Sequence, residues 1–234
     1  MRFIRHTDGV IRAMETFELA DGRTIAANTL GGTIASVRNL AQAGTCWVFP
    51  GSSVEGNAYV SGNAIVQSSP LGRAGRVREN AQVYGNALIR GGTVSGHARV
   101  LDNAVIEHES TVTDEAAVYQ DAKVLSAGSI SGRARVLGEA IIDGGRVRGD
   151  ARVSGSPLIR GLIEDQAHVS GCPDINAGSI VRCNARVSGC VRLINAILDC
   201  NAVVYGNRTV ENVTINDAGL VTVCPDKGTR DCCS

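Results

Sequence analysis

Residues Val54 to Val66 read VEGNAYVSGNAIV, and this stretch contains two copies of a six-residue repeat. Each copy begins with valine, passes through Gly-Asn and reaches alanine four positions after the valine. A period of six does not match the 3.6 residues per turn of an α-helix, and valine- and glycine-rich segments are poor helix formers. The stretch therefore predicts short β-strands separated by sharp bends.

Aliphatic residues continue along the chain in steps of mostly five or six, with one longer gap between Val66 and Val77. Grouped in threes, they make turns of 17 or 18 residues. The groups are Val54, Val60, Val66; Val77, Val83, Ile89; Val94, Val100, Ile106; Val112, Val118, Val124; Ile130, Val136, Ile142; Val147, Val153, Ile159; Ile163, Val169, Ile175; Val181, Val187, Leu193; and Leu198, Val204, Val210. Three strands and three bends per turn predict an all-β fold, a triangular parallel β-solenoid of about nine coils.

Alanine stands four positions after most of these aliphatic residues, so we expect both to fill the interior of the prism. Between them lie pairs such as Gly62-Asn63, Gly85-Asn86 and Asp102-Asn103. Glycine, asparagine and aspartate tolerate positive φ, which a sharp corner requires. The pattern thus assigns the interior and the corners and leaves the residues beside the aliphatic positions for the outer surface.

Composition limits the kinds of partner. Lysine plus arginine and aspartate plus glutamate number 23 each, so no global charge favours nucleic acid or an acidic membrane. The first residues, MRFIRHTDGV, lack the apolar segment of a secretory signal, and no apolar run is long enough for a membrane helix. We expect a cytoplasmic protein without nucleic-acid or membrane partners, in which the eight cysteines are mainly free thiols.

The repeat, an aliphatic residue followed four positions later by a small one, resembles the hexapeptide repeat of left-handed β-helix proteins. The segment Gly31 to Ala64 further resembles YdcK-type proteins, bacterial and phage proteins whose acyltransferase activity is inferred from the repeat itself. The shared residues are Gly31, Gly32, Asn39, Leu40, Gln42, Gly44, Cys46, Trp47 and Val48, whereas Thr33 and Ala41 replace the tryptophan and serine of that pattern. The resemblance covers about residues 25 to 214. It implies a left-handed parallel β-helix. From the extent of the repeat we expect this helix over residues 37–214, an N-terminal cap over 1–36, and a C-terminal cap or tail over 215–234.

Outward residues on one face of the prism form a basic stripe. The residues that precede the second aliphatic of each group include Arg99, Arg135, Arg152, His168 and Arg186, with Tyr59 and Gln82 at the start of the same column. One interpretation is a solvated face whose charges prevent edge-to-edge aggregation. The other is a binding site for an anionic small molecule such as a nucleotide.

Apolar outward residues on both sides of one corner form a second surface feature. They are Ile65, Leu88, Val105, Ile141 and Leu158 on one face and Tyr84, Leu101, Tyr119 and Leu137 on the next. A ridge of this length would leave more apolar surface exposed to water than is usual for a monomer, so we expect the protein to self-associate along it. Parallel trimers are usual for left-handed β-helices, and a threefold arrangement leaves no ridge free. The alternative is a monomer with some exposed aliphatic residues.

Candidate catalytic residues come from the resemblance. Hexapeptide acyltransferases use histidine as a general base with an acyl-CoA such as acetyl-CoA, which here implies His108 or His97 as the base and Arg99, Arg135 and Arg152 near the CoA phosphates. His108 is flanked by two glutamates that could orient its ring, whereas His97 occupies a corner position. The only insertion, QSSPLGRAGR at residues 67–76, is too short for the long loop of such enzymes but could overhang a groove between subunits.

The cysteines do not form a metal-binding motif. Cys172 and Cys190 are 18 residues apart and Cys183 and Cys200 are 17 apart, so each pair should occupy equivalent corners of successive coils. No C-x-x-C pair occurs among them, and we predict no metal site.

Three functions remain open. The first is a noncatalytic trimeric β-helix that acts as a scaffold or binding protein, with an anionic small molecule in grooves between subunits. The second is an acyl-CoA-dependent acyltransferase, and the third is a structural element of a phage particle.

Overall fold

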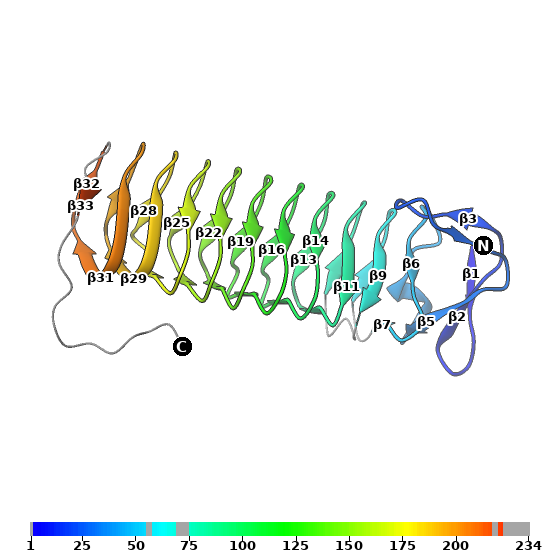
Figure 1. The fold of residues 1–234 in the computed structure, drawn as a ribbon. Coiled ribbons are helices and arrows are strands. Elements are labelled where there is room, and N and C mark those ends of the chain that lie inside the picture. The colour runs from blue at the N-terminus through cyan, green and yellow to red at the C-terminus, as the bar shows by residue number, and fades with distance from the viewer. Residues whose placement is uncertain (1, 55–57, 69–74, 217–219, 222–234) are drawn as a thin grey trace.

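The chain forms a rod of stacked β-strands, seen in a computed structural model that describes residues 2–54, 58–68, 75–216 and 220–221. The N-terminal segment folds into a cap at one end, and the coils follow one another toward the C-terminal end (Figure 1). Within the described residues, no helix is long and apolar enough to cross a membrane. We name the three sides of the prism face A, face B and face C in the order in which the chain passes through them.

Face A is a parallel sheet of 10 strands, one from each coil. In chain order its strands are β8 (Tyr59–Val60), β10 (Arg76–Val77), β13 (Thr93–Val94), β16 (Thr111–Val112), β19 (Ser129–Ile130), β22 (Arg146–Val147), β25 (Leu162–Ile163), β28 (Ile180–Val181), β30 (Ile197–Leu198) and β32 (Thr214–Ile215). At about 4.8 Å per coil the stack is roughly 45 Å long.

Faces B and C stack in the same way and join through two long strands that bend across the corner. Face B contains β6 (Trp47–Val48), β9 (Ile65–Ser68), β11 (Gln82–Gly85), β14 (Arg99–Val100), β17 (Ala117–Val118), β20 (Arg135–Val136), β23 (Arg152–Val153), β26 (His168–Val169), the first parts of β29 (Arg186–Ile194) and β31 (Val203–Glu211), and β33 (Leu220–Val221). Face C contains β12 (Leu88–Arg90), β15 (Val105–Glu107), β18 (Lys123–Leu125), β21 (Ile141–Asp143), β24 (Leu158–Ile159), β27 (Asp174–Ile175) and the ends of β29 and β31.

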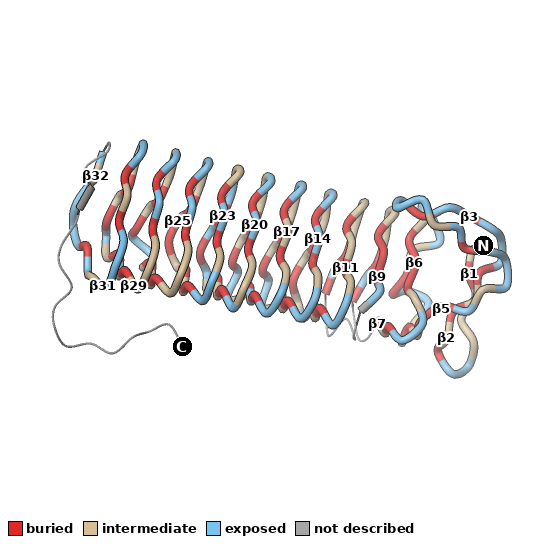
Figure 2. The backbone as a smooth tube through the Cα atoms, viewed as in Figure 1, coloured by how far each residue is buried: buried red, intermediate tan, exposed pale blue. Residues whose placement is uncertain are grey.

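The interior is built from the repeat. Val83 lies beside Val100 and Val136 beside Val153 in parallel register, and all four side chains are fully buried. Because successive residues of a strand point to opposite faces, the residue before each buried aliphatic points outward. Buried and exposed segments accordingly alternate along every coil (Figure 2). The predicted fold class, an all-β parallel β-helix, is confirmed.

The corners carry the residues that tolerate positive φ. Asp102 and Asp114 have φ of 59° and 61°, and Gly138 has φ of 81°. Side-chain ladders also connect the corners: Asn86 donates to Asn103 at 3.1 Å, and Asn103 donates to Asp121 at 3.0 Å. These side-chain hydrogen bonds link successive coils in the same register as the backbone hydrogen bonds of the sheets.

The predicted register of the first coil is wrong. Tyr59 pairs with Arg76 on face A, and Ile65 pairs with Gln82 on face B, so each of them lies one face earlier than expected. Val54 instead pairs with Ile34. Among the described residues face A has ten strands rather than the predicted nine coils, because β32 adds a strand after the last predicted group, which ended at Val210.

The N-terminal cap is an antiparallel sheet that runs directly into the solenoid. It contains β1 (Phe3–Arg5), β2 (Val10–Ala13) and β5 (Leu30–Ile34), of which β5 pairs in parallel with β7 (Ser53–Val54). The hairpin of β3 (Phe17–Glu18) and β4 (Thr24–Ile25) and the 3₁₀ helix η1 (Val37–Asn39) complete it. Phe17 contacts Trp47 edge-on, with ring centroids 5.7 Å apart, which closes the first coil with a buried aromatic pair.

At the other end, coil stacking continues past the predicted boundary at residue 214. Strand β32 pairs with β30, and β33 pairs with β31. Most of the predicted C-terminal tail, and residues 69–74 of the predicted overhanging insertion, lie outside the described residues.

Candidate anion-binding groove

A groove of about 660 Å³ runs along face B beside the corner that joins it to face A. Four of the five predicted basic-stripe residues line it: Arg135, Arg152, His168 and Arg186. These four residues, which we call the cation ladder, occupy equivalent positions of β20, β23, β26 and β29 and pair in parallel register, each with the next. The structure thus brings together residues that lie 16 to 18 positions apart in the sequence.

The shape of the groove follows from strand alternation. Two residues before each ladder residue, a corner residue also points outward, and the alanine between them, such as Ala151 or Ala167, is fully buried. The corner wall contains Arg133, Asp150, Gln166, Asn184 and Asn201. Sequence reasoning missed this wall, although its signal, a polar residue two positions before each stripe residue, was present in the repeat.

The ladder arginines differ from most other arginines nearby in their electrostatic surroundings. On the corners beside the groove, Arg133 pairs with Asp150 at 2.7 Å and Arg182 pairs with Asp199. Within the described part of the chain, by contrast, no carboxylate lies within ion-pair distance of Arg135, Arg152 or Arg186. The groove therefore concentrates positive charge that the described residues do not neutralise.

His168 lies between two of these arginines. Partial burial lowers its pKa from the ordinary value of 6.5, and the charges of Arg152 and Arg186 lower it further. The free protein therefore favours the neutral imidazole at neutral pH, and a bound anion would favour the protonated form.

The corner wall adds neutral hydrogen-bonding groups. Asn184 donates to the side-chain oxygen of Asn201 at 3.3 Å, and Gln166 lies beside them on the same wall. Amides both donate and accept hydrogen bonds, so this wall can bind oxygen atoms that the guanidinium groups do not reach.

A second groove of about 620 Å³ continues along face B toward the N-terminus. Its lining includes His97, Arg99, Ala117, Tyr119 and Arg135, so the two grooves share Arg135. Ala117 separates Arg99 from Arg135 in the ladder register. Arg99, the fifth stripe residue, is therefore separated from the cation ladder by one intervening coil.

The two candidate catalytic histidines lie at different corners. The ring of His97 is 3.3 Å from the side-chain amide of Asn80, at the corner between faces A and B. His108 lies at the corner between faces C and A, where its side chain is 72% exposed and its Nδ1 is 3.7 Å from Glu107. Glu107 also accepts a hydrogen bond from Arg90, so it is not dedicated to orienting His108. One monomer does not combine His108 with the cations of face B.

The predicted apolar ridge forms only in part. Leu88, Leu101, Val105, Tyr119, Leu137, Ile141 and Leu158 are partly exposed on both sides of the corner between faces B and C. Ile65 is fully buried, so its expected place on the ridge is wrong, because it lies on face B between Trp47 and Gln82 rather than on face C. Lys123 interrupts the column between Val105 and Ile141.

Tyr84, also assigned to the ridge, contacts the N-terminal cap. Its hydroxyl donates to Asp21 at 3.1 Å and accepts from Arg23 at 3.4 Å. Burial and the hydrogen bond to Asp21 raise the pKa of Tyr84. Contacts within the chain therefore already cover the N-terminal end of the ridge.

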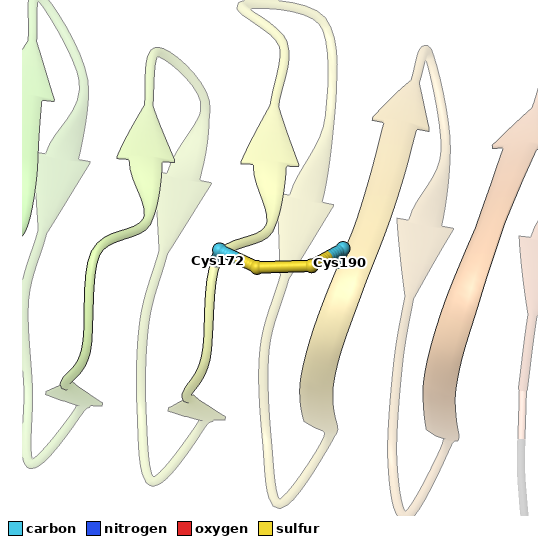
Figure 3. The surroundings of a disulfide bond; sticks show 2 residues. All are labelled: Cys172 and Cys190. Carbon is cyan, nitrogen blue, oxygen red and sulfur yellow. A yellow bond between two sulfur atoms is a disulfide. The ribbon is translucent and has the colours of Figure 1, made fainter. Parts of the chain in front are cut away.

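Two cysteines form a disulfide, contrary to the expectation of free thiols. Cys172 and Cys190 join adjacent coils at the corner between faces B and C (Figure 3). Cys183 and Cys200 remain thiols, and Cys183 donates a hydrogen bond of 3.0 Å to Asp199, which raises its pKa. No group of three or more histidine, cysteine or acidic side chains that could hold a metal occurs among the described residues.

Comparison with known proteins identifies the repeat but no individual relative. The family model described as YdcK Beta solenoid repeat matches residues 81–96, which include β11, β12 and β13 and so make one turn of the prism. No curated protein matches the chain. The sequence resemblance and the stacked coils agree with this match, and the chain is a β-solenoid protein in which residues 81–96 match the YdcK repeat.

Proposed function

We propose that this protein is a noncatalytic binding or scaffold protein that holds a phosphate-bearing anion in the groove of face B. The cation ladder carries the proposal: Arg135, Arg152, His168 and Arg186 line one groove in register, and the described residues offer the three arginines no ion-pair partner.

The energetics favour an anionic ligand. Like charges separated by the strand spacing of about 4.8 Å repel by about 1 kcal/mol in water, and by more where protein excludes water. An oxyanion bound between the side chains of two successive ladder residues (two rungs of the ladder) offsets this repulsion. The planar guanidinium group presents two donors that match phosphate oxygens. The neighbouring amides then accept or donate further hydrogen bonds.

The lining argues for binding without reaction. The nine residues that line the groove are arginines, a histidine, an aspartate and amides, with no serine, threonine or cysteine to act as a nucleophile. The aspartate, Asp150, is held in an ion pair with Arg133. Retention of the anion, rather than transfer of a group, fits this set of residues.

Self-association is part of the proposal. The ridge residues that stay partly exposed on both sides of the corner between faces B and C would be covered in a homotrimer. Face B borders this corner, so a neighbouring subunit would form a second wall beside the groove.

The proposal is tested by anion binding with variants matched in charge. The Arg135→Gln/Arg152→Gln double variant removes two positive charges from the ladder, whereas Arg76→Gln/Arg146→Gln removes two from exposed positions on face A. In isothermal titration with a nucleoside diphosphate, we expect the first pair to weaken binding at least about tenfold and the second by less than about twofold. Equal losses in both double variants, or no binding of any phosphate compound by the unaltered protein, would refute a specific site on face B.

Acyl transfer is a second candidate, because His97 lines the same groove as Arg99 and Tyr119. His97 would act as the general base and Arg99 with Arg135 would bind the CoA phosphates. If acetyl-CoA is consumed with an acceptor amine or alcohol and His97→Gln abolishes the reaction while retaining binding, the noncatalytic proposal fails.

A further inference from the structure

We infer that the ligand of the face B groove is a linear oligophosphate that lies along the rod axis across four coils. This inference rests on the proposed function, because it names the class of anion that the same site takes.

The repeat of the cation ladder sets the repeat of the ligand. Backbone N–H groups of Arg135, Arg152 and His168 each donate to a carbonyl of the next coil at 2.9 Å, which fixes the rungs at the strand spacing of about 4.8 Å. Arg135 and Arg186 are three rungs apart, which places their backbones roughly 14 Å from each other. A compact anion such as orthophosphate spans at most two rungs, whereas a linear chain with a charge on every unit can contact all four.

The ladder has two defined ends. Arg135 is followed toward the N-terminus by Ala117, and Arg186 is followed toward the C-terminus by Val203. Neither side chain can bind an anion, so the favourable contacts stop there. The affinity should therefore rise with chain length and then level off once the ligand spans the ladder.

The lining also distinguishes an oligophosphate from a nucleic acid strand. Proteins that bind single strands without sequence preference stack the bases on aromatic side chains. The residues that line this groove include no tyrosine, phenylalanine or tryptophan. The site thus recognises the charged backbone and offers no platform for a base.

The experiment is a titration of the full chain with orthophosphate, pyrophosphate, tripolyphosphate and a longer oligophosphate at constant ionic strength. We expect affinity to rise by about tenfold each time the ligand becomes long enough to contact one more residue of the cation ladder, because each arginine contact to phosphate is charge-assisted. Arg135→Gln and Arg186→Gln, at opposite ends of the ladder, should each lower the affinity for the longest ligand by about tenfold. The face A variant Arg146→Gln should leave this affinity unchanged. Ala117→Arg should extend the ladder toward Arg99 and raise the length at which affinity levels off.

The outcomes separate this inference from the proposed function. If no phosphate compound binds at any length, the proposed function itself fails. If orthophosphate or a nucleoside diphosphate binds as tightly as the longest chain, or if only one end of the ladder matters, the site holds a compact anion and the inference fails alone. Tighter binding of a single-stranded oligonucleotide than of an oligophosphate of equal charge would also overturn it.

Discussion

The hydroxyl of Tyr84 donates a hydrogen bond of 3.1 Å to Asp21, which ties the turn of the β3–β4 hairpin to the edge of the solenoid. Arg23 completes the contact, since it pairs with Asp21 at 2.7 Å and lies over the ring of Phe49, 4.2 Å from its centroid. The cap is therefore fixed by polar side chains as well as by the sheet that it shares with the first coil.

Tyr84→Phe should lower the free energy of unfolding by about 1 kcal/mol at neutral pH, because Asp21 loses a charge-assisted donor. Burial opposes ionisation of Asp21, but the hydrogen bonds from Arg23 and Tyr84 outweigh it and hold its pKa below the ordinary 3.8. The stabilisation is present above that pH and is lost as the pH falls below it. Chemical denaturation at neutral and acid pH measures this, with Tyr119→Phe on the same face as the control. Equal stability of the Tyr84 variant and the unaltered protein at neutral pH would contradict the account of the cap.

The fold was predictable from the sequence because its repeat fixes both the interior and the corners in every coil. The register of the first coil was not, since a series that passes from Val66 straight to Val77 skips Leu71 and so places Tyr59 and Ile65 one face too late. The cation ladder could be predicted because basic residues recur at the spacing of one coil in the sequence. The corner wall that turns this stripe into a groove depends on which corner residues point outward. The contact between Tyr84 and Asp21 joins residues 63 positions apart and has no periodic signal.

Truncation of a core column should test the packing. Ile142 is fully buried between Val124 and Ile159 in the ladder of face C. Ile142→Ala should cost about 3 kcal/mol of unfolding free energy, because it leaves a cavity that the stacked strands cannot collapse, whereas Ile142→Val should cost about 1 kcal/mol. Denaturant titration measures both values. Similar small losses for the two substitutions would mean that the interior of the prism is loosely packed.

A corner glycine should be far less tolerant of a side chain than a glycine of similar conformation in the cap. Gly155 and Gly22 both have φ of 85°, but a Cβ at Gly155 would lie 2.4 Å from the carbonyl oxygen of Gly171, whereas none of the described atoms lies within 4 Å of one at Gly22. Gly22→Ala should cost about 1 kcal/mol for the left-handed backbone, and Gly155→Ala about 3 kcal/mol because the coils must also separate. Thermal unfolding of the two variants makes the comparison, and equal melting temperatures would show that coil spacing at this corner is not fixed.

Anion binding should strengthen as the pH falls. Burial and the two flanking arginines lower the pKa of His168, so the imidazole is neutral in the free protein at neutral pH and must take up a proton to add a charge to the ladder. For an anion that does not itself titrate in this range, such as sulfate, affinity should therefore rise by up to about tenfold as the pH falls from about 7.5 to about 5.5, and His168→Gln should remove most of that dependence. Titrations in two buffers of different ionisation enthalpy measure the proton uptake. An unchanged pH profile in His168→Gln would place the titrating group elsewhere.

Self-association should depend on the exposed ridge. Leu137→Lys places a charge at the corner that Ile141 and Leu158 also border, where the proposed subunits meet, and burial of an unpaired charge costs several kcal/mol. Light scattering after size exclusion should give a trimer for the unaltered protein and a monomer for Leu137→Lys. The control, Thr113→Lys, changes a residue that follows a strand of face A instead. A monomeric unaltered protein at micromolar concentration would refute the trimer.

The site on face B is tested most directly by anomalous scattering from crystals soaked in tungstate, a heavy analogue of phosphate. The account predicts ordered tungsten peaks beside the guanidinium groups of Arg152 and Arg186, along the groove and clear of lattice contacts. Peaks confined to exposed arginines of face A, such as Arg76 and Arg146, or no peak in the groove at a concentration that saturates binding in solution, would contradict it.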